Sequence, residues 1–487
     1  MRKNLNLLLA FAVCALCAPG AQAGTPESAA FIDRGRSLFD FGRWTDARHE
    51  FLQARETLSP ADREAAQTVD FYLAACAVEL GSRDAEAALR RFEARYPGSV
   101  YANDVRFSLG SYYCAEGDMK RAREAFEKTD YKALGRARKE QYDVRMGYVE
   151  FTDGDYDKAF GYFDRIGPQS EYADHALYYK SYIDYAEGRY GRAKQGFTAL
   201  QRSDAYRDVV PYYLLQIEFH EGNYRYVVEN GGKLVQRAVP ERRKELERVI
   251  AESWFRLGDF NKTIEHLDAF VAAGGELDRD GSYLMGFSLY RTARYPEAAE
   301  YLRRACGAED ALTQNASYHL ADCYLRAGDK RAAMHAFAMA ADDRFDATIA
   351  EDALFNYGKL QYELGGGAFN GAINVLTRYV EQYPASPRVG EARTLLIAAY
   401  YNSNDYDAAY RAIKSFPTQD ADIRAALQKI TYFRGLEAYN AGDMRAAQRY
   451  LAESAAINVS PKYSALNSFW QGEIAFAQGE YTVAAAK

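Results

Sequence analysis

The 487-residue sequence has few of the residues from which catalytic and metal sites are built. It contains only six cysteines and six histidines. It has no G-x-S-x-G nucleophile turn, no G-x-x-x-x-G-K-[ST] phosphate loop and no H-E-x-x-H zinc motif. The histidines are scattered along the chain, and the acidic residues lie where solvated helix faces are expected. We therefore expect neither an enzyme nor a cofactor.

Cysteine is too sparse for a disulfide framework. Cys76 and Cys114 fall at different heights on neighbouring helices, which argues against the Cα separation within about 7 Å that a disulfide needs. His319 and Cys323 share a helix face and Cys306 is close in the chain, but a fourth zinc ligand and paired spacing are missing. We favour four small buried side chains and expect no metal site, with disulfides as the open alternative.

Long apolar runs are absent except at the beginning of the chain. Two basic residues precede an apolar stretch over residues 7–18, and a small-x-small cleavage site ends at Ala23. Twelve apolar residues are too few for a membrane-spanning helix. We predict a signal peptide over residues 1–23, cleaved between Ala23 and Gly24, and no transmembrane segment after its removal. An uncleaved anchor is the less favoured alternative.

Basic residues do not outnumber acidic ones. The chain carries 61 Lys and Arg against 68 Asp and Glu, a formal net charge of −7. Proteins that bind nucleic acid need clustered Lys and Arg to neutralise phosphates. Nucleic acid is therefore not expected as a partner.

The sequence does contain one pattern that recurs thirteen times at a spacing of 34 to 39 residues. A turn glycine is followed by an aromatic or long residue at plus two, alanine at plus five and a bulky apolar residue at plus nine, as in Gly154, Tyr156, Ala159 and Phe163. A small residue recurs seven positions before the glycine. The glycine allows a sharp turn between two helices, the small residues let the helices approach, and the bulky residue fills the space between copies. Repetition at this period predicts a solenoid. The turn positions are 42, 81, 117, 154, 188, 222, 258, 293, 328, 367, 404, 442 and 479.

These residues resemble the tetratricopeptide repeat, whose unit carries a small residue, a turn glycine, an aromatic residue, an alanine and an aromatic residue in this order. The resemblance covers nearly all of residues 24–487. It implies an all-α, α-solenoid fold, a right-handed superhelix of about thirteen helix-turn-helix units. Ala293 and Asn404 depart from the pattern by replacing the turn glycine. We expect two extra residues before the alanine of the second copy, Ala88, and we expect Gly358 at the small position of the tenth.

The thirteenth copy begins at Gly479 and stops at Lys487, one residue before its bulky position. Solenoids need a polar cap over the last apolar face. We therefore expect the array over residues 24–487 to be truncated at its C-terminal end. The alternative is that the last half-copy frays.

In this family the first helix of each unit lines the concave face, so positions ten, six and three before the turn glycine are expected to face a groove. Aromatic residues gather there in copies four to six, and clustered exposed aromatics are typical of interfaces. The alternative is that these rings pack between helices. The candidate partner-binding residues are Tyr148, Phe151, Tyr178, Tyr182, Tyr185, Tyr212 and Phe219, and a second group is Tyr283, Phe287, Tyr290 and Tyr318.

Segments 96–99 (YPGS) and 383–386 (YPAS) are similar to periplasmic family members that serve outer-membrane assembly and Tol-associated division machinery. With the signal peptide, this resemblance implies an exported protein, periplasmic or outer-membrane-associated in a Gram-negative bacterium. We hypothesise a scaffold that binds envelope proteins or extended peptide segments through its concave face. The alternatives are a structural or oligomerising component of an envelope assembly, or the recognition part of a larger protein whose activity lies beyond residue 487. The oligomeric state is left open.

Overall fold

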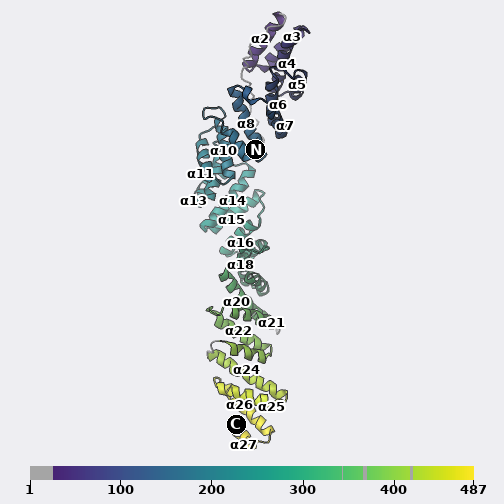
Figure 1. The fold of residues 1–487 in the computed structure, drawn as a ribbon. Coiled ribbons are helices and arrows are strands. Elements are labelled where there is room, and N and C mark those ends of the chain that lie inside the picture. Colours follow the sequence, from purple (N-terminus) through teal and green to yellow (C-terminus); the bar gives the residue numbers. More distant parts are fainter. Residues whose placement is uncertain (1–25, 343, 366–369, 417–420) are drawn as a thin grey trace. The chain divides into compact units, whose positions relative to one another are not determined.

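Sharp turns divide the chain into consecutive pairs of α-helices in the computed structural model (Figure 1). The structure describes residues 26–342, 344–365, 370–416 and 421–487. These residues form 26 α-helices and one short 3-10 helix, with no strand among them. None of the described helices is both long and apolar enough to cross a membrane. The predicted signal peptide and its cleavage site, Ala23 and Gly24, lie outside the described residues.

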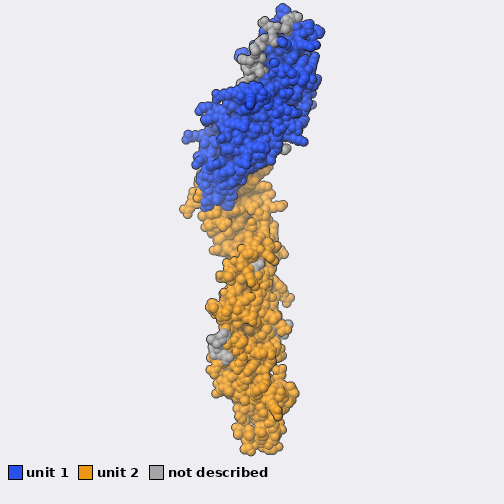
Figure 2. Space-filling model, viewed as in Figure 1, with its two compact units in different colours: residues 1–222 blue, residues 223–487 orange. Residues whose placement is uncertain are grey.

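The contacts of the chain separate it into two compact units, residues 1–222 and residues 223–487 (Figure 2). In the first unit, α2 pairs with α3 and α4 with α5, and the same order continues to α12. The first helices of neighbouring pairs also contact one another, α2 with α4, α4 with α6 and α6 with α8. The helices of this unit are α2 (Pro26–Asp40), α3 (Trp44–Thr57), α4 (Arg63–Glu79), α5 (Ala85–Arg95), α6 (Ala102–Glu116), α7 (Met119–Glu127), η1 (Tyr131–Ala133), α8 (Arg136–Thr152), α9 (Tyr156–Phe163), α10 (Ala173–Ala186), α11 (Tyr190–Leu200) and α12 (Val210–His220).

The second unit repeats the same arrangement. Its first helices contact one another in an unbroken series from α14 to α26. Its helices are α13 (Tyr224–Val235), α14 (Pro240–Leu257), α15 (Phe260–Ala272), α16 (Arg279–Arg291), α17 (Tyr295–Ala305), α18 (Ala311–Arg326), α19 (Lys330–Asp342), α20 (Ala347–Leu364), α21 (Asn370–Gln382), α22 (Val389–Asn402), α23 (Tyr406–Ser415), α24 (Ala421–Asn440), α25 (Met444–Ile457), α26 (Pro461–Ala477) and α27 (Tyr481–Ala485). The predicted all-α solenoid of helix pairs is confirmed.

The turn positions adopt the left-handed backbone conformation that the pattern predicts. The ten turn glycines within the described residues have φ between +59° and +83°. Ala293 and Asn404 adopt the same conformation at +61° and +58°, although each carries a side chain. Aspartate directly after the turn adds a cap, as where the carboxylate of Asp155 accepts a hydrogen bond from the backbone N–H of Lys158. Glycine and aspartate therefore end one helix and begin the next.

The small position seven residues before the turn lies against the bulky residue of the same copy. A Cβ atom added to Gly110 would lie 2.6 Å from the ring of Phe126, and one added to Gly147 would lie 2.8 Å from the ring of Phe163. In the tenth copy, Gly358 meets Leu376 in the same way, as predicted. These distances are shorter than any side chain tolerates, so only glycine fits without movement of a neighbour.

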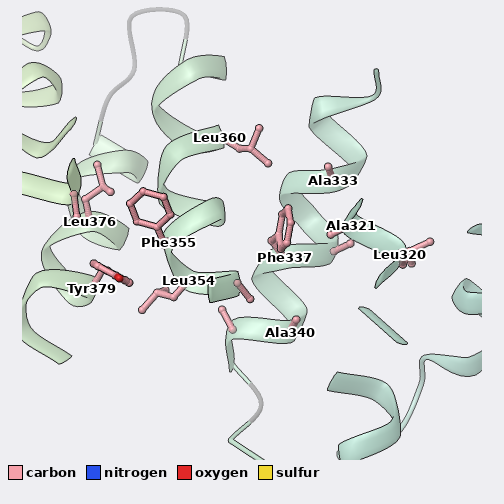
Figure 3. Close-up of a cluster of buried hydrophobic side chains, with 14 of the residues drawn as sticks. Leu320, Ala321, Ala333, Phe337, Ala340, Leu354, Phe355, Leu360, Leu376 and Tyr379 are labelled. Atoms are coloured by element: carbon pink, nitrogen blue, oxygen red, sulfur yellow. The ribbon is translucent and has the colours of Figure 1, made fainter. Parts of the chain in front are cut away.

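The bulky residues also join neighbouring copies by aromatic stacking. Phe163 lies face to face with Tyr179 of the next copy, with ring centroids 5.1 Å apart. The same arrangement joins Phe197 to Tyr213, at 4.9 Å. Figure 3 shows buried side chains of the second unit, where Phe355 of α20 faces α21 and lies 5.4 Å from Tyr379 of the same copy. Among the described residues, equivalent positions of successive copies therefore form shared cores, with two buried clusters in each unit, and each cluster spans more than one copy.

The second copy differs from our expectation. Ala85, the first residue of α5, is fully buried, whereas Ala88 is half-buried. Leu89, four residues after Ala85, is fully buried as well. α5 begins at Ala85, four residues after Gly81, whereas α7 and α9 begin two residues after their turn glycines, so the predicted lengthening of this turn by two residues is confirmed. The fully buried alanine is nevertheless Ala85 and not Ala88, so the predicted contact residue is wrong.

Candidate partner-binding surface

Three first helices of the first unit carry the aromatic residues predicted from the sequence. Tyr148 and Phe151 lie on α8, Tyr182 and Tyr185 on α10, and Tyr212 with Phe219 on α12. The ring of Phe151 lies 5.2 Å from that of Tyr182, which joins α8 to α10. The pair Tyr182 and Tyr185 are 6.4 Å apart on the same helix face. The structure therefore brings Phe151, Tyr182 and Tyr185 into contact, whereas Tyr212 and Phe219 reach Tyr185 through the rings of their neighbours Tyr213 and His220.

Six of the seven candidates are half-buried: Tyr148, Phe151, Tyr182, Tyr185, Tyr212 and Phe219. Tyr178 is the exception, since only 7% of it is exposed. Its ring stacks on Tyr206 at 4.6 Å and its hydroxyl donates a hydrogen bond to that of Tyr213. Tyr178 is therefore a packing residue, and the expectation that it faces a groove is wrong. We call the six half-buried residues the aromatic surface.

Two buried tyrosines that were not among the predicted residues pack against the rings of the aromatic surface. Tyr179 contacts Tyr148 and Phe151 edge-on, at 5.7 and 4.8 Å. Tyr213 contacts Tyr182 and Tyr185 in the same way, at 5.6 and 5.7 Å. Both stand nine positions before a turn glycine, which is the position that stacks on the bulky residue of the preceding copy. The sequence does contain a signal for these two tyrosines: each stands nine positions before its turn glycine, and the preceding copy has phenylalanine nine positions after its own turn glycine.

The electrostatics of this region keep the rings neutral. Burial raises the pKa of Tyr182 above its ordinary value. Burial also lowers the pKa of His175 to about 4, and its Nδ1 lies 2.6 Å from the hydroxyl of Tyr206. At neutral pH the surface therefore offers uncharged rings and phenol groups, which suits recognition of apolar and polar peptide groups.

The second predicted group, in the second unit, is tied into the scaffold by its hydroxyls. Tyr283 donates to Asn315, Tyr290 to Asp322 and Tyr318 to Asp352, at 2.7 to 2.8 Å. Each acceptor stands about one repeat later in the chain. These tyrosines link neighbouring copies, which makes them weaker binding candidates than the aromatic surface.

The four cysteines of the described chain are free thiols. Cys76, Cys114 and Cys323 are buried, and Cys306 is half-buried with its thiol 3.3 Å from the hydroxyl of Ser317. Within the described ranges, no three His, Cys, Asp or Glu side chains gather as metal ligands would. Burial raises the pKa of Cys76 to about 12, so that thiol is not an activated nucleophile.

Comparison with known proteins agrees with the helix-pair geometry. Residues 283–348 match the tetratricopeptide repeat model, and residues 349–469 match the YfiO model, described as an outer membrane lipoprotein. No curated protein has a significantly similar sequence. Matching solved structures include a chain of the APC/C hetero-tetramer Cut9–Hcn1, at 13% identity and a TM-score of 0.28, covering 91% of this chain and 89% of that one. Another is a chain of Naa15/Naa10 bound to HypK-THB, at 16% identity and a TM-score of 0.29, covering 87% and 67%.

Both matched family models fall in the second unit, and helix pairs with the same turn and small-residue geometry occur in the first. The predicted resemblance to the tetratricopeptide repeat is thereby confirmed by the family model over residues 283–348, and residues 349–469 are similar to the outer membrane lipoprotein family.

Proposed function

We propose that this protein is an exported scaffold that binds an envelope protein, through an extended peptide segment, on the aromatic surface of α8, α10 and α12. One observation supports the proposal above all: the first helices of three successive copies carry six half-buried aromatic side chains, of which Phe151 and Tyr185 both contact Tyr182, and these are not the fully buried positions by which the copies pack. Aromatic residues are enriched in protein interfaces because they bury a large area at a small entropic cost.

The match of residues 349–469 to an outer membrane lipoprotein family supports a location in the cell envelope, and so does the signal peptide predicted over residues 1–23. Stacked copies hold the aromatic surface in place before a partner arrives. The partner segment then contributes most of the entropic cost of ordering, while the receptor contributes little.

Site-specific cross-linking in the exporting cell tests this proposal. Benzoylphenylalanine replaces Tyr182 in one variant and Tyr226 in another, so that an aromatic ring is kept at both positions. Tyr226 lies on α13 and is 45% exposed, which makes it a matched control outside the aromatic surface. We expect an envelope protein to be cross-linked at 182 but not at 226.

Removal of rings gives the complementary test. Tyr148→Ala and Tyr182→Ala should each weaken capture of the cross-linked partner by at least about 1 kcal/mol, and Tyr226→Ala should not. Circular dichroism and melting temperature must first show that the variants fold. Equal capture by the folded wild type and the folded Tyr148→Ala/Tyr182→Ala variant would reject the aromatic surface as the binding site.

A further inference from the structure

A cavity of about 530 Å³ opens among α21, α22 and α23 of the second unit, on residues that the aromatic surface does not include. Arg393, Leu396 and Tyr400 come from α22, whereas Val380 comes from α21 and Arg411 from α23. Its walls are more apolar than polar, and two arginines and one glutamate are among the residues that line it. We call it the Arg393 cavity, lined mainly by Val380, Arg393, Leu396, Tyr400, Arg411 and Phe416.

Arg393 is the unusual member of this lining, because it is a buried cation without an anion. Only 7% of it is exposed, and its Nε is buried without a hydrogen-bond partner. Among the described residues, its side chain forms no ion pair and no hydrogen bond, and its one close charge-stabilising neighbour is the ring of Phe416 at 5.0 Å. Arg411 differs, since it pairs with Asp407. Burying an unpaired charge is costly, so native proteins rarely do it without a compensating partner.

Another copy of the repeat shows which partner is missing. Arg106 and Arg393 both stand eleven residues before a turn position, and both follow a Tyr-Pro-x-Ser segment by seven residues. The two segments fold alike, since Ser99 accepts a hydrogen bond from the N–H of Tyr101 and Ser386 from that of Arg388.

In the earlier copy, the guanidinium of Arg106 pairs with Glu93, at 3.3 Å. The residue that corresponds to Glu93, thirteen positions before the arginine, is Val380. The chain thus keeps the arginine in the later copy and replaces its acid with an apolar residue that lines the cavity. Glu381 also lines the cavity, and among the described residues no ion pair joins it to Arg393.

We infer that the Arg393 cavity binds a carboxylate attached to an apolar group. The guanidinium of Arg393 binds the carboxylate in place of the missing glutamate, and the wall of Val380, Leu396 and Phe416 holds the apolar group. Guanidinium groups bind carboxylates through two parallel hydrogen bonds, and a buried setting strengthens that contact. The volume lies in the range of small-ligand sites. A fatty acid and the C-terminal residue of a peptide both have this chemistry.

Calorimetric titration of the purified mature chain distinguishes the two sources. The probes are octanoate and N-acetyl-Leu-Phe with a free carboxylate, each compared with its uncharged amide. We expect one acid to bind at least about tenfold more tightly than its amide, and the acid that does so identifies the source. Arg393→Gln should weaken that acid by about 10- to 100-fold and leave the amide unchanged, as expected for loss of a charged hydrogen bond.

Val380→Glu is a second variant that tests the inference without removing the arginine. It rebuilds the ion pair that Glu93 and Arg106 form, so it should fold at least as stably as the wild type and lose binding of the same acid by at least about tenfold. Three results would overturn the inference: neither acid binds, the amides bind as tightly as the acids, or the folded Val380→Glu protein binds the acid as the wild type does.

Discussion

Gly147→Ala should destabilise the protein, although alanine is the better helix former. A Cβ at this position in α8 would lie 2.8 to 3.0 Å from three ring atoms of Phe163. That ring is 1% exposed and stacks on Tyr179 on its other side, so it has no space into which to retreat. Overpacking of this kind costs about 1–3 kcal/mol, and replacing glycine in a helix returns about 1 kcal/mol. The expected net loss is about 1 kcal/mol in the free energy of unfolding, the middle of the range of about 0–2 kcal/mol that these two terms leave.

Gly161→Ala is the matched control for this substitution. Gly161 lies in α9 of the same copy, is exposed, and a Cβ there would meet no atom within 4 Å. It should stabilise by about 0.5–1 kcal/mol. Urea unfolding followed by circular dichroism measures both variants. Because repeat arrays can unfold in parts, hydrogen exchange of the α8 and α9 amides should report the same order locally.

A double-mutant cycle tests the cause. In a Phe163→Ala background the clash is gone, so Gly147→Ala should become neutral or stabilising. If Gly147→Ala alone is as stable as the wild type, or if its cost persists without the ring, the close contact between the two helices is not what selects glycine here.

Three further predictions concern the scaffold. Ala159→Leu and Ala193→Leu should each cost about 1–3 kcal/mol by overpacking, because both alanines are fully buried, and unchanged thermal melting of both would contradict this. Ala293→Gly should raise the free energy of unfolding by up to about 1 kcal/mol, because φ at this residue is +61°, and denaturant midpoints that fall would contradict it. His175 has a folded-state pKa lowered to about 4 from 6.5 by burial, so below pH 6.5 the unfolded chain takes up the proton first. Stability should then fall with pH between 6.5 and about 4, by at most about 1.4 kcal/mol per unit, and urea titrations of His175→Gln should show a shallower fall.

The repeat positions could be predicted from the sequence because each has one physical role that recurs. Left-handed turns need glycine or a tolerant substitute, and the structure places both Ala293 and Asn404 in that conformation. The contact between Gly358 and Leu376 also followed from the spacing, although three successive glycines obscure the turn between them. In the second copy the longer turn was predicted correctly but the contact residue was not, because two alanines, Ala85 and Ala88, lie in the first turn of α5 and the spacing does not show which of them is buried.

The candidate site was less predictable, because one helix face serves packing and binding at once. The pattern predicts that every residue ten positions before a turn faces the groove, yet Tyr178 is buried and Tyr212 is half-buried. The difference arises from Tyr206, which stacks on Tyr178 and lies in the connection between α11 and α12. Connections vary in length from copy to copy, and a repeat pattern carries no information about where their side chains lie.

Residues that the repeat architecture requires differ from residues that carry specificity within this chain. Positions seven before, five after and nine after the turn have to keep their size, because each contacts a rigid neighbour in its own or the adjacent copy. Arg106 and Arg393 occupy a position outside that set. Within the described ranges Arg106 pairs with an acid and Arg393 pairs with none, although the preceding turn has the same hydrogen bond in both copies. A residue that packing explains in every copy gives no evidence of binding. Arg393 is different, because one copy keeps a costly buried charge without its partner, and a bound ligand is the simplest physical reason for that.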